Sequence, residues 1–457
     1  FPKCGKIDKP VVIVGTGPAG LMCGLTLAQN GYKVILLERG KCVEERMKDV
    51  EAFWEAGFLN PESNVQFGEG GAGTFSDGKL TTGIKDFRIR KVLEEFHKHG
   101  APKEILYYSK PHVGTDNLSK MVASIRSEIR KLGGEVRFSN KLVNVKTDNG
   151  EICGAVVESD SGEYVIETNN IVLAIGHSAR DTFLMLQNRN IAMEQKSFSV
   201  GARIEHKQTA VDESLYGDHA GNPLLPKGEY QLSWRDKNGR GVYTFCMCPG
   251  GFVVPAASSS RQVVVNGMSP SNRGSRWANS GMVVEIRPED YSELMKHEEM
   301  AVSKDSPLAL MAFQERLEEL CWLNGGMKQT APAQRMVDFV NKKNSFDLPE
   351  SSYTPGLLAS PLHFWMPEFV TGRLREGFRH FGKVSRGFLT NDAVMIGVET
   401  RTSSPVRILR DKESYQHITL KGLFPCGEGA GYAGGIVSAA IDGERCAEGV
   451  AGYLSLV

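Results

Sequence analysis

The sequence lacks an excess of charge of either sign. Lys+Arg and Asp+Glu both number 54 in 457 residues, so the formal net charge is zero. Proteins that bind nucleic acid usually carry a marked excess of Lys and Arg, which attracts the phosphate backbone. The composition therefore predicts no nucleic-acid partner.

Long apolar runs and paired cysteines are also missing. No stretch approaches 18 consecutive apolar residues and no signal peptide is recognisable, so no membrane span is expected. The nine cysteines are scattered, and only Cys246 and Cys248 are close in sequence, with no second pair to complete a zinc site. The sequence thus predicts no disulfide framework, no metal site and a reducing, cytoplasmic environment.

Glycine, in contrast, is plentiful. The chain has 50 glycines in 457 residues, about 11%, against roughly 7% in an average protein. Many of them fall in three clusters, within residues 15–24, 68–78 and 427–435. Such clusters are typical of places where the backbone turns tightly or approaches a ligand closely.

The first cluster lies inside a predicted strand–helix–strand unit. Residues 10–14 and 33–37 are β-branched, apolar runs of the kind that form buried parallel strands, and residues 21–28 have the pattern of a helix. The turn between the first strand and the helix reads Gly15-x-Gly17-x-x-Gly20. In dinucleotide-binding proteins these glycines allow the bend, the approach of the pyrophosphate and the packing of the helix.

An acid closes this unit. Glu38 directly follows the second predicted strand, 18 residues after Gly20. A carboxylate at this distance accepts hydrogen bonds from the ribose hydroxyls and disfavours a 2′-phosphate. The fingerprint therefore predicts FAD or NAD rather than NADP.

The other end of the chain favours FAD. Residues 420–428 read as a short strand that ends in Gly427 and Glu428, and a glycine-rich run then leads into a predicted helix over 436–448. In FAD proteins of this fold, the acid holds the ribitol chain and the positive helix end points at the flavin. Residues 168–176, an apolar strand ending in Gly176, are expected to bring the chain back beside the dinucleotide.

Five motifs together resemble one protein family. They are VIVGTGPAGL at 12–21, GGAGTFSDGK at 70–79, KPHVGTD at 110–116, GVETRTSSP at 397–405 and GEGAGYAGGIV at 427–437. With these motifs the whole chain resembles the FAD-dependent dehydrogenases often labelled NAD(FAD)-utilising dehydrogenases, among the glutathione-reductase-like flavoproteins. The resemblance implies FAD as cofactor and leaves the substrate undefined.

We therefore expect an α/β fold, with a Rossmann-like FAD-binding domain of the glutathione-reductase type and an inserted mixed α+β substrate or cap domain. The FAD domain is predicted to be discontinuous, over 1–200 and 385–457, with the cap domain at 201–384. Predicted elements in the first part are a helix at 116–131 and strands at 141–145 and 154–157. In the insertion they are strands at 199–205, 263–265 and 283–286 and a helix at 308–320.

The residues expected to contact FAD come from all of these segments. They are Gly15, Gly17, Pro18, Ala19, Gly20, Glu38, Arg39, Gly71, Gly73, Thr74, Val143, Gly176, Gly427, Glu428, Gly434, Gly435 and Ile436.

Three side chains are candidates for catalysis. Lys79 is predicted to lie near the flavin, with a surface loop as the alternative. His112 is either a flavin-side acid or base or a structural histidine, and Asp116 beside it is either part of the site or a helix N-cap. Arg401 is expected to bind an anionic substrate group or stabilise reduced flavin, the alternative being a buried pair with Glu399. Cys248 is either a thiol facing the flavin or, more in keeping with its strained C-x-C spacing, a packing residue.

The predicted activity is hydride transfer between a small-molecule substrate and flavin N5. Only one proper dinucleotide fingerprint is present, so NAD(P)H is expected at most as a transient electron donor. Two alternatives stay open: an electron-transfer or redox-sensing flavoprotein with a protein partner, and an FAD-dependent RNA-modification protein, which the neutral charge disfavours.

Overall fold

The first structural unit is built on a five-stranded parallel sheet. The computed structural model describes residues 8–295, 298 and 302–455. The strand order is β19-β7-β1-β2-β3, and all neighbours run parallel. Their bounds are Val11–Val14 (β1), Val34–Leu37 (β2), Glu135–Arg137 (β3), Asn170–Leu173 (β7) and Leu423–Pro425 (β19). The strand–helix–strand unit predicted from the sequence is thus confirmed to within one residue of each predicted strand.

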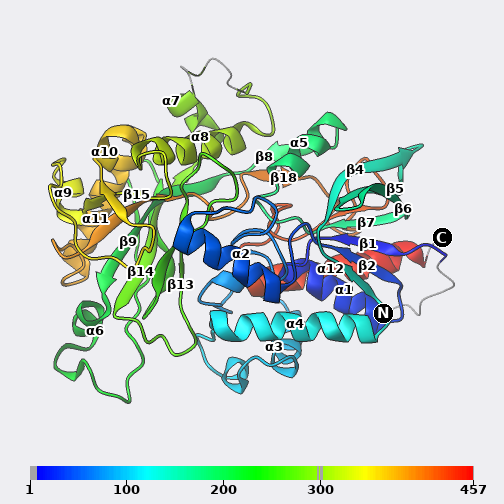
Figure 1. Ribbon diagram of the computed structural model, residues 1–457, viewed down its shortest axis with the longest axis horizontal. Helices are drawn as coiled ribbons and strands as arrows, with labels where there is room; N and C mark the ends of the chain where they lie inside the picture. The colour runs from blue at the N-terminus through cyan, green and yellow to red at the C-terminus, as the bar shows by residue number, and fades with distance from the viewer. Residues whose placement is uncertain (1–7, 296–297, 299–301, 456–457) are drawn as a thin grey trace.

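The two faces of this sheet are covered by different layers. Val11 and Ile13 face the helices, whereas Val12 and Val14 face a small antiparallel sheet, because side chains alternate along a strand. Figure 1 shows both layers. The helical layer contains α1 (Pro18–Gln29), α3 (Arg88–Lys98), α4 (Thr115–Lys131) and α12 (Ile436–Leu454), and the small sheet contains β4 (Asn140–Asp148), β5 (Glu151–Ser159) and β6 (Gly162–Glu167).

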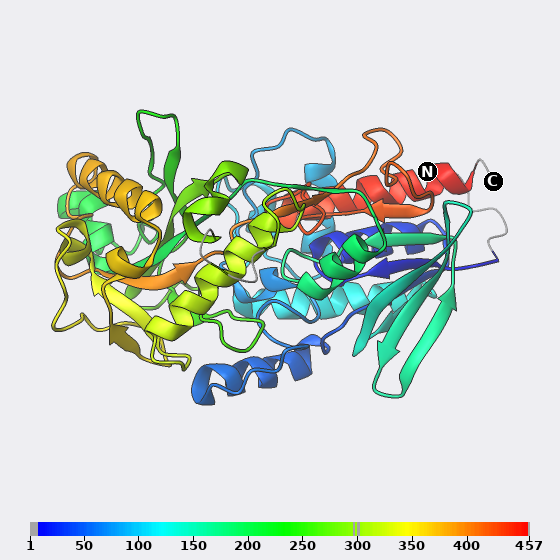
Figure 2. The ribbon, with the colours of Figure 1, turned by 90° about the horizontal axis from the view of Figure 1, so that it is seen from above.

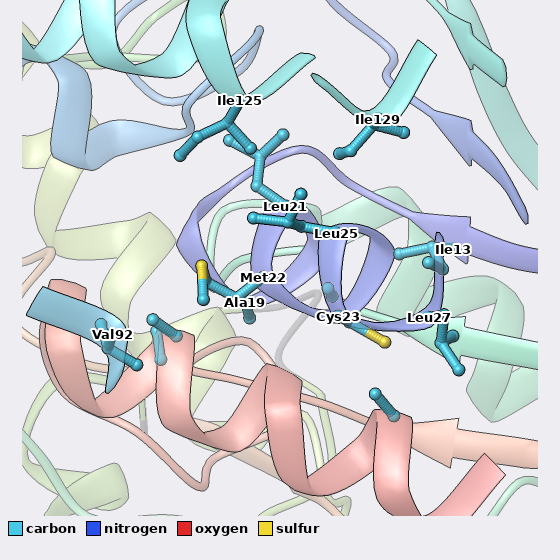
Figure 3. Close-up of a cluster of buried hydrophobic side chains, with 14 of the residues drawn as sticks. Ile13, Ala19, Leu21, Met22, Cys23, Leu25, Leu27, Val92, Ile125 and Ile129 are labelled. Atoms are coloured by element: carbon cyan, nitrogen blue, oxygen red, sulfur yellow. The ribbon is translucent and has the colours of Figure 1, made fainter. Parts of the chain in front are cut away.

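Helix α1 lies at the centre of the helical layer. Its apolar side chains pack between Ile125 and Ile129 of α4 on one side and α12 on the other (Figure 3). The contact with α12 is close because α12 has a glycine there: a Cβ on Gly443 would lie 2.1 Å from the carbonyl oxygen of Ala19. The first and last helices of the chain are therefore held side by side.

The second unit is a seven-stranded mixed sheet at the other end of the molecule (Figure 1). Its order is β10-β11-β14-β9-β17-β15-β16, antiparallel except for the β15–β16 pair. The bounds are Ser233–Arg235 (β10), Gly241–Cys248 (β11), Trp277–Ile286 (β14), Phe198–Lys207 (β9), Val394–Glu399 (β17), Ala331–Arg335 (β15) and Leu357–Ala359 (β16). Helices α8 (Ala309–Asn324) and α11 (Glu368–Val384) pack on it, as the view from above shows (Figure 2).

Shorter elements connect and cover these layers. They are α2 (Val43–Ala56), α5 (Arg180–Asn188), α6 (Gln208–Tyr216), α7 (Tyr291–Met295), α9 (Met336–Val340) and α10 (Leu362–Trp365), with the strand pairs β8 (Met193–Gln195) and β18 (Val406–Ile408), and β12 (Phe252–Pro255) and β13 (Val265–Met268). None of the helices that the structure describes is both long and apolar enough to cross a membrane.

Two predicted boundaries differ from the structure. The strand expected at 263–265 begins at Val265, because the two preceding valines belong to the connection from β12. Residues 394–399, counted from the sequence in the resumed FAD domain, form β17 and pair with β9 and β15 of the seven-stranded sheet. All six residues of β17 are buried, and such an apolar run carries no information about which sheet it joins. The domain limits themselves stay a prediction.

The turn between β1 and α1 leads to the first test. A Cβ on Gly20 would lie 1.9 Å from the carbonyl oxygen of Gly15, which is backbone and cannot move aside. We expect Gly20→Ala to lower the free energy of unfolding by about 1–3 kcal/mol or more, since 1–3 kcal/mol is the usual cost of overpacking. Urea unfolding of the purified protein measures this.

The matched control is Gly452→Ala near the end of α12, where a Cβ meets no atom within 4 Å. This variant should be neutral, or more stable by up to about 1 kcal/mol, because alanine favours the helix. Equal urea midpoints for Gly20→Ala and the wild type would contradict the described turn.

Candidate cofactor and substrate site

A cavity of about 350 Å³ lies between the two sheets. Val14 and Leu37 on its wall end β1 and β2, and Ala174 and Cys426 directly follow β7 and β19. The cavity therefore opens at the carboxyl ends of the parallel strands, where ligands bind in sheets of this kind. Its volume is in the range of ligand pockets in proteins.

Most of the residues predicted from the sequence to contact the cofactor meet at this cavity. Those on its wall are Gly15, Gly17, Pro18, Ala19, Glu38, Arg39, Gly71, Gly73, Gly176, Glu428, Gly434, Gly435 and Ile436, together with the catalytic candidates Lys79 and Arg401. Segments that are more than 400 residues apart in the sequence are thus brought together.

Four residues that the sequence predicts to contact the cofactor are not among the described residues that line the cavity. Gly20 packs against Gly15 inside the turn, and the amide of Gly427 donates to Asp442 at 2.7 Å. The hydroxyl of Thr74 donates to the carbonyl of Glu69. Val143 lies in a bulge of β4 between Leu142 and Asn144, and Leu142 is the cavity-lining residue there.

Three wall glycines leave open space that the protein does not fill. A Cβ on Gly17 would meet no atom closer than the Cα of Gly71 at 3.9 Å, and a Cβ on Gly434 would meet none within 4 Å. For Gly435 the nearest atom is the Ser438 hydroxyl at 4.0 Å. Neither Gly17 (φ −69°) nor Gly435 (φ 177°) needs glycine for its backbone conformation. This cradle of bare backbone fits a group that lies directly against the chain.

Two helices begin at this cradle. Gly17 precedes α1 and Gly435 precedes α12, and within the described residues neither helix has a side-chain N-cap or an acid in its first turn. The first N–H groups of each helix are therefore available to a ligand, and both helix dipoles present their positive ends. One of these two helix N-termini could bind a diphosphate, and the other could lie beside an electron-rich ring.

Glu38 is buried and ties three segments together. One carboxylate oxygen accepts hydrogen bonds from the amide and hydroxyl of Thr16, at 3.0 and 2.6 Å. The other accepts from the amides of Gly40 and Gly68, both at 3.0 Å. These four donors match the lone pairs of the carboxylate, so a ribose hydroxyl has to replace one of them. Only the Thr16 hydroxyl is a side-chain donor, which makes it the one that can rotate away.

The glycine-rich loop that follows is organised by a buried arginine. Arg46 of α2 is fully buried and donates to the carbonyl groups of Asn64, Val65, Gly68, Glu69 and Gly71. Burial lowers the pKa of Arg46 to about 10, so the group stays charged at neutral pH. A planar guanidinium with five N–H groups holds the backbone of the loop in one shape.

Lys79 lies at the far end of this loop, on the cavity wall. Its ammonium contacts Asp77 at 2.9 Å and Glu229 at 3.5 Å, and Asp77 also accepts two hydrogen bonds from Arg273. Asp77 raises the pKa of Lys79 against the opposing effect of burial. The lysine is thus charged and anchored, and the surface-loop alternative does not describe it.

His112 and Asp116 are placed differently from the expectation. His112 is absent from the described lining of the cavity, and its Nε2 contacts the carbonyl of Ser271 at 3.3 Å. Asp116 is the second residue of α4, whose N-cap is Gly114, so it is not an N-cap. Its carboxylate accepts from the amide and hydroxyl of Ser271 at 2.8 and 2.7 Å. Both side chains hold the loop that contains Ser271 against the unit built on the parallel sheet.

Arg401 has a partner that sequence reasoning missed. Its guanidinium binds both oxygens of Glu318 in α8, at 2.7 and 3.0 Å, and donates to the hydroxyl of Ser178 at 2.5 Å. Glu399, the partner expected from the sequence, instead pairs with the buried Arg203 at 2.7 Å. The two residues therefore pair with partners on different elements, and spacing along the chain could not assign those partners.

A second arginine shares Glu318. Arg180 donates to the same carboxylate at 2.9 Å. Burial opposes ionisation of Glu318, but Arg180 and Arg401 outweigh it and lower its pKa to about 2. Arg180 also contacts Glu315 at 3.7 Å, so the cluster sets two arginines against two glutamates. No local motif marks Arg180 or Glu318, because they meet only in the folded chain.

His177 and Glu428 form the neighbouring part of the wall. His177 Nε2 lies 3.9 Å from a Glu428 oxygen. Burial, with the charges of Arg401 and Arg180, lowers the pKa of His177 to about 3, so the ring is neutral. Burial raises the pKa of Glu428 to about 7, which leaves this carboxyl able to hold or release a proton near neutral pH.

The two close cysteines differ in their exposure to the cavity. Cys248 is fully buried, whereas Cys246 lines the cavity next to Phe245. The sequence singled out Cys248, but a bulge in β11 between Phe245 and Cys248 turns Cys246 toward the cavity.

Comparison with known proteins supports this description. Residues 9–215 match the family described as "Pyridine nucleotide-disulphide oxidoreductase", and residues 197–402 match "FAD-dependent protein, C-terminal domain-like". An uncharacterized protein of Clostridium beijerinckii is 47% identical over 446 residues, 97% of this chain and 81% of that protein. The chain belongs to the FAD-dependent pyridine nucleotide-disulphide oxidoreductase family. The family and the fold class expected from the sequence are thereby confirmed.

More distant similarities cover less or agree less closely. A digeranylgeranylglycerophospholipid reductase of Methanocella arvoryzae is 23% identical over 177 residues, 37% of this chain and 40% of that protein. The solved structure of the flavin-dependent brominase Bmp2 has a TM-score of 0.43 and 14% identity, covering 98% of this chain and 79% of that one.

The raised pKa of Glu428 leads to a test by pH. Its pKa is about 7 in the fold against 4.5 for an ordinary glutamate, so the native state binds more protons than the unfolded state between these values. The contribution of Glu428 to the stability of the FAD-free protein should therefore fall as pH rises from 5 to 8. Glu428→Gln should therefore lose less free energy of unfolding between pH 5 and pH 8 than the wild type, by at most about 3 kcal/mol. Urea unfolding at pH 5 and at pH 8 measures this difference.

Glu51→Gln on the exposed face of α2 serves as the control and should leave the pH dependence of the wild type unchanged. Parallel stability–pH curves for Glu428→Gln and the wild type would show that the Glu428 carboxyl ionises normally.

Proposed function

We propose that this member of the family is an FAD-dependent oxidoreductase that transfers a hydride between a small-molecule substrate and flavin N5. The observation that carries the proposal is the composition of one cavity wall. FAD-type elements line the same space as residues of the second unit, among them Phe245 of the seven-stranded sheet and Asn266 of the β12–β13 pair. A cofactor bound along the parallel sheet would therefore meet its substrate under the second sheet.

We propose a place along this cradle for each part of the cofactor. The pyrophosphate would lie on Gly17 and the first turn of α1, and the ribose on Glu38 after the Thr16 hydroxyl rotates away. The bulge at Val143 frees backbone groups that would bind the adenine edge. Gly434, Gly435 and the first turn of α12 would receive the flavin end.

The chemistry of the reaction belongs to the cofactor, since bound FAD supplies hydride exchange at N5. The protein residues orient the reactants and set the charge around them. Lys79 and Arg401 present fixed positive charges at the wall, which favour an anionic substrate group and the anionic form of reduced flavin. Glu428, with a pKa of about 7, is the wall residue best suited to hold the ribitol chain or move a proton.

Gly17→Ala tests the cofactor assignment. A Cβ at this position meets the protein only at an ordinary van der Waals distance of 3.9 Å, so the variant should fold with the stability of the wild type. The new methyl group occupies the space proposed for the pyrophosphate. We expect FAD affinity to fall at least about tenfold, or 1.4 kcal/mol, in an equilibrium titration of FAD-free protein.

Gly452→Ala is again the control and should bind FAD like the wild type. If Gly17→Ala bound FAD with unchanged affinity, the pyrophosphate would have to lie elsewhere.

A second experiment tests the reaction class and its electron donor. FAD-loaded protein is mixed anaerobically with NADH or NADPH, and the flavin absorbance is followed. We expect bleaching with a saturable rate, since a nicotinamide can bind transiently over the flavin without a domain of its own. Bleaching by dithionite but by neither nicotinamide would favour the alternative function, an electron-transfer flavoprotein that is reduced by a protein partner.

A further inference from the structure

Asn266 places an amide group on the cavity wall. The residue belongs to β13, which contacts β9, β11, β14 and β17 of the seven-stranded sheet. The next residue, Gly267, makes this close packing possible. A Cβ at Gly267 would lie 2.2 Å from Oδ1 of Asn279 and 2.3 Å from Nη1 of Arg203. The backbone beside Asn266 therefore lies directly on the sheet, and the position of the amide on the wall is fixed.

Two donors decide which end of this amide faces the protein. Oδ1 of Asn266 accepts a hydrogen bond from Nη2 of Arg203 at 3.3 Å and one from the backbone amide of Gly267 at 2.8 Å. Guanidinium and backbone N–H groups can only donate, so the atom that they contact has to be the oxygen. The NH2 group is the other end of the same planar amide, and it points away from these donors.

Arg203 is a rigid support for this arrangement. It is fully buried, and each of its five N–H groups has an acceptor. Two of them bind the carboxylate of Glu399, and the others bind the carbonyl of Cys246, Oδ1 of Asn279 and Oδ1 of Asn266. A guanidinium with all five donors bound is held in one orientation. The buried pair of Arg203 and Glu399 therefore positions Asn266.

The NH2 group of Asn266 is left for a ligand. It donates to no residue in the part of the chain that the structure describes, and the half-buried side chain lines the cavity. Asn279 offers a comparison, because its Nδ2 also lacks an acceptor among the described residues but is enclosed by protein. A molecule in the cavity can thus accept a hydrogen bond from Asn266, whereas Asn279 is out of its reach.

Lys79 supplies a second donor to the same space. Its ammonium has three N–H groups and makes one hydrogen bond to the described residues, with Asp77 at 2.9 Å, while Glu229 lies 3.5 Å away. Asp77 also accepts two hydrogen bonds from Arg273, which lies in the loop that follows β13. Lys79 and Asn266 are therefore connected through one framework, and both have N–H groups left for a ligand at the cavity wall.

We propose that the substrate is an organic acid whose carboxylate accepts hydrogen bonds from Asn266 and Lys79. This inference rests on the proposed function, because it takes the flavin end of the cofactor to lie in the same cavity. A carboxylate offers acceptors and a negative charge, so it matches an amide donor beside an ammonium, whereas a cationic group would leave both donors unused. The half-buried ring of Phe245, on the same wall, offers an apolar surface to the body of the acid.

Binding of benzoate to the FAD-loaded full chain tests this inference. Benzoate carries a carboxylate on an apolar ring, and a molecule that binds beside the flavin changes the flavin absorbance spectrum. Benzamide has the same shape without the charge and is the comparison probe. We expect the wild type to bind benzoate at least about tenfold more tightly than benzamide, because hydrogen bonds to a charged acceptor are stronger than those to a neutral one.

Asn266→Asp should abolish this preference. The new carboxylate keeps an oxygen for Arg203 and Gly267 but turns an oxygen instead of an NH2 group to the cavity. We expect the affinity for benzoate to fall at least about tenfold, because a donor is lost and like charges meet. Benzamide should bind as it does to the wild type, since its own NH2 group can donate to the new carboxylate. Damage to the fold would instead weaken both probes.

Two further variants complete the series. Asn266→Ala removes the donor without adding a charge, so the preference for benzoate should fall about three- to tenfold. Asn272→Asp is the matched control in the exposed loop after β13, where Oδ1 of Asn272 accepts from the amide of Gly274 at 3.0 Å. The same change of charge at this exposed position should leave both affinities within about twofold of the wild type, because solvent and salt screen it.

The outcomes separate the two proposals. If the yellow wild-type protein binds benzoate no more tightly than benzamide, or its spectrum does not respond to benzoate, the inference is overturned and the proposed function stands. The same follows if both Asn266 variants keep the preference of the wild type. A chain that does not retain added FAD contradicts the proposed function, and the inference about its substrate is lost with it.

Discussion

The carboxylate of Glu38 joins the three segments on which the cavity depends. It accepts hydrogen bonds from the turn after β1, from Gly40 shortly after β2 and from the glycine-rich loop at Gly68. Each buried donor left without a partner would cost about 1–3 kcal/mol, so this one side chain sets the spacing of all three segments. Arg46 then holds the loop by its carbonyl groups, as Glu38 holds it by its amide. Glu38 and Arg46 together hold the backbone of the glycine-rich loop, which has few side chains of its own to fix its shape.

Charge is also what joins the two sheets at the cavity. Arg401 follows β17 of the second sheet, and its carboxylate partner Glu318 belongs to α8 on that sheet. Arg180 and Ser178 come from the first unit and complete the same cluster. A cluster shared in this way aligns the two units. Arg401 also lines the cavity, so its guanidinium is available to an anionic group that binds there.

The parts predictable from the sequence are those encoded locally. The turn at Gly15–Gly20, Glu38 and the start of α12 follow from spacing along the chain, because a strand, a turn and a helix must be consecutive. The partner of Arg401 was not predictable, since Glu318 lies 83 residues away on another element. Likewise, a bulge places Cys246 on the cavity wall, and the regular alternation of a strand gives no sign of it. For His112 the sequence left a flavin-side role and a structural role open, because a motif position does not show that the loop with Ser271 packs over it.

The backbone conformation at Cys246 decides which thiol reaches the cavity. Among the described residues, most left-handed positions are glycines, for instance Gly68, Gly70 and Gly71 beside the cavity. Cys246 adopts a left-handed conformation with a φ of 43°, which costs roughly 1 kcal/mol or more. Cys248, two residues later, is fully buried, so the bulge in β11 places the Cys246 thiol on the wall that Lys79 also lines.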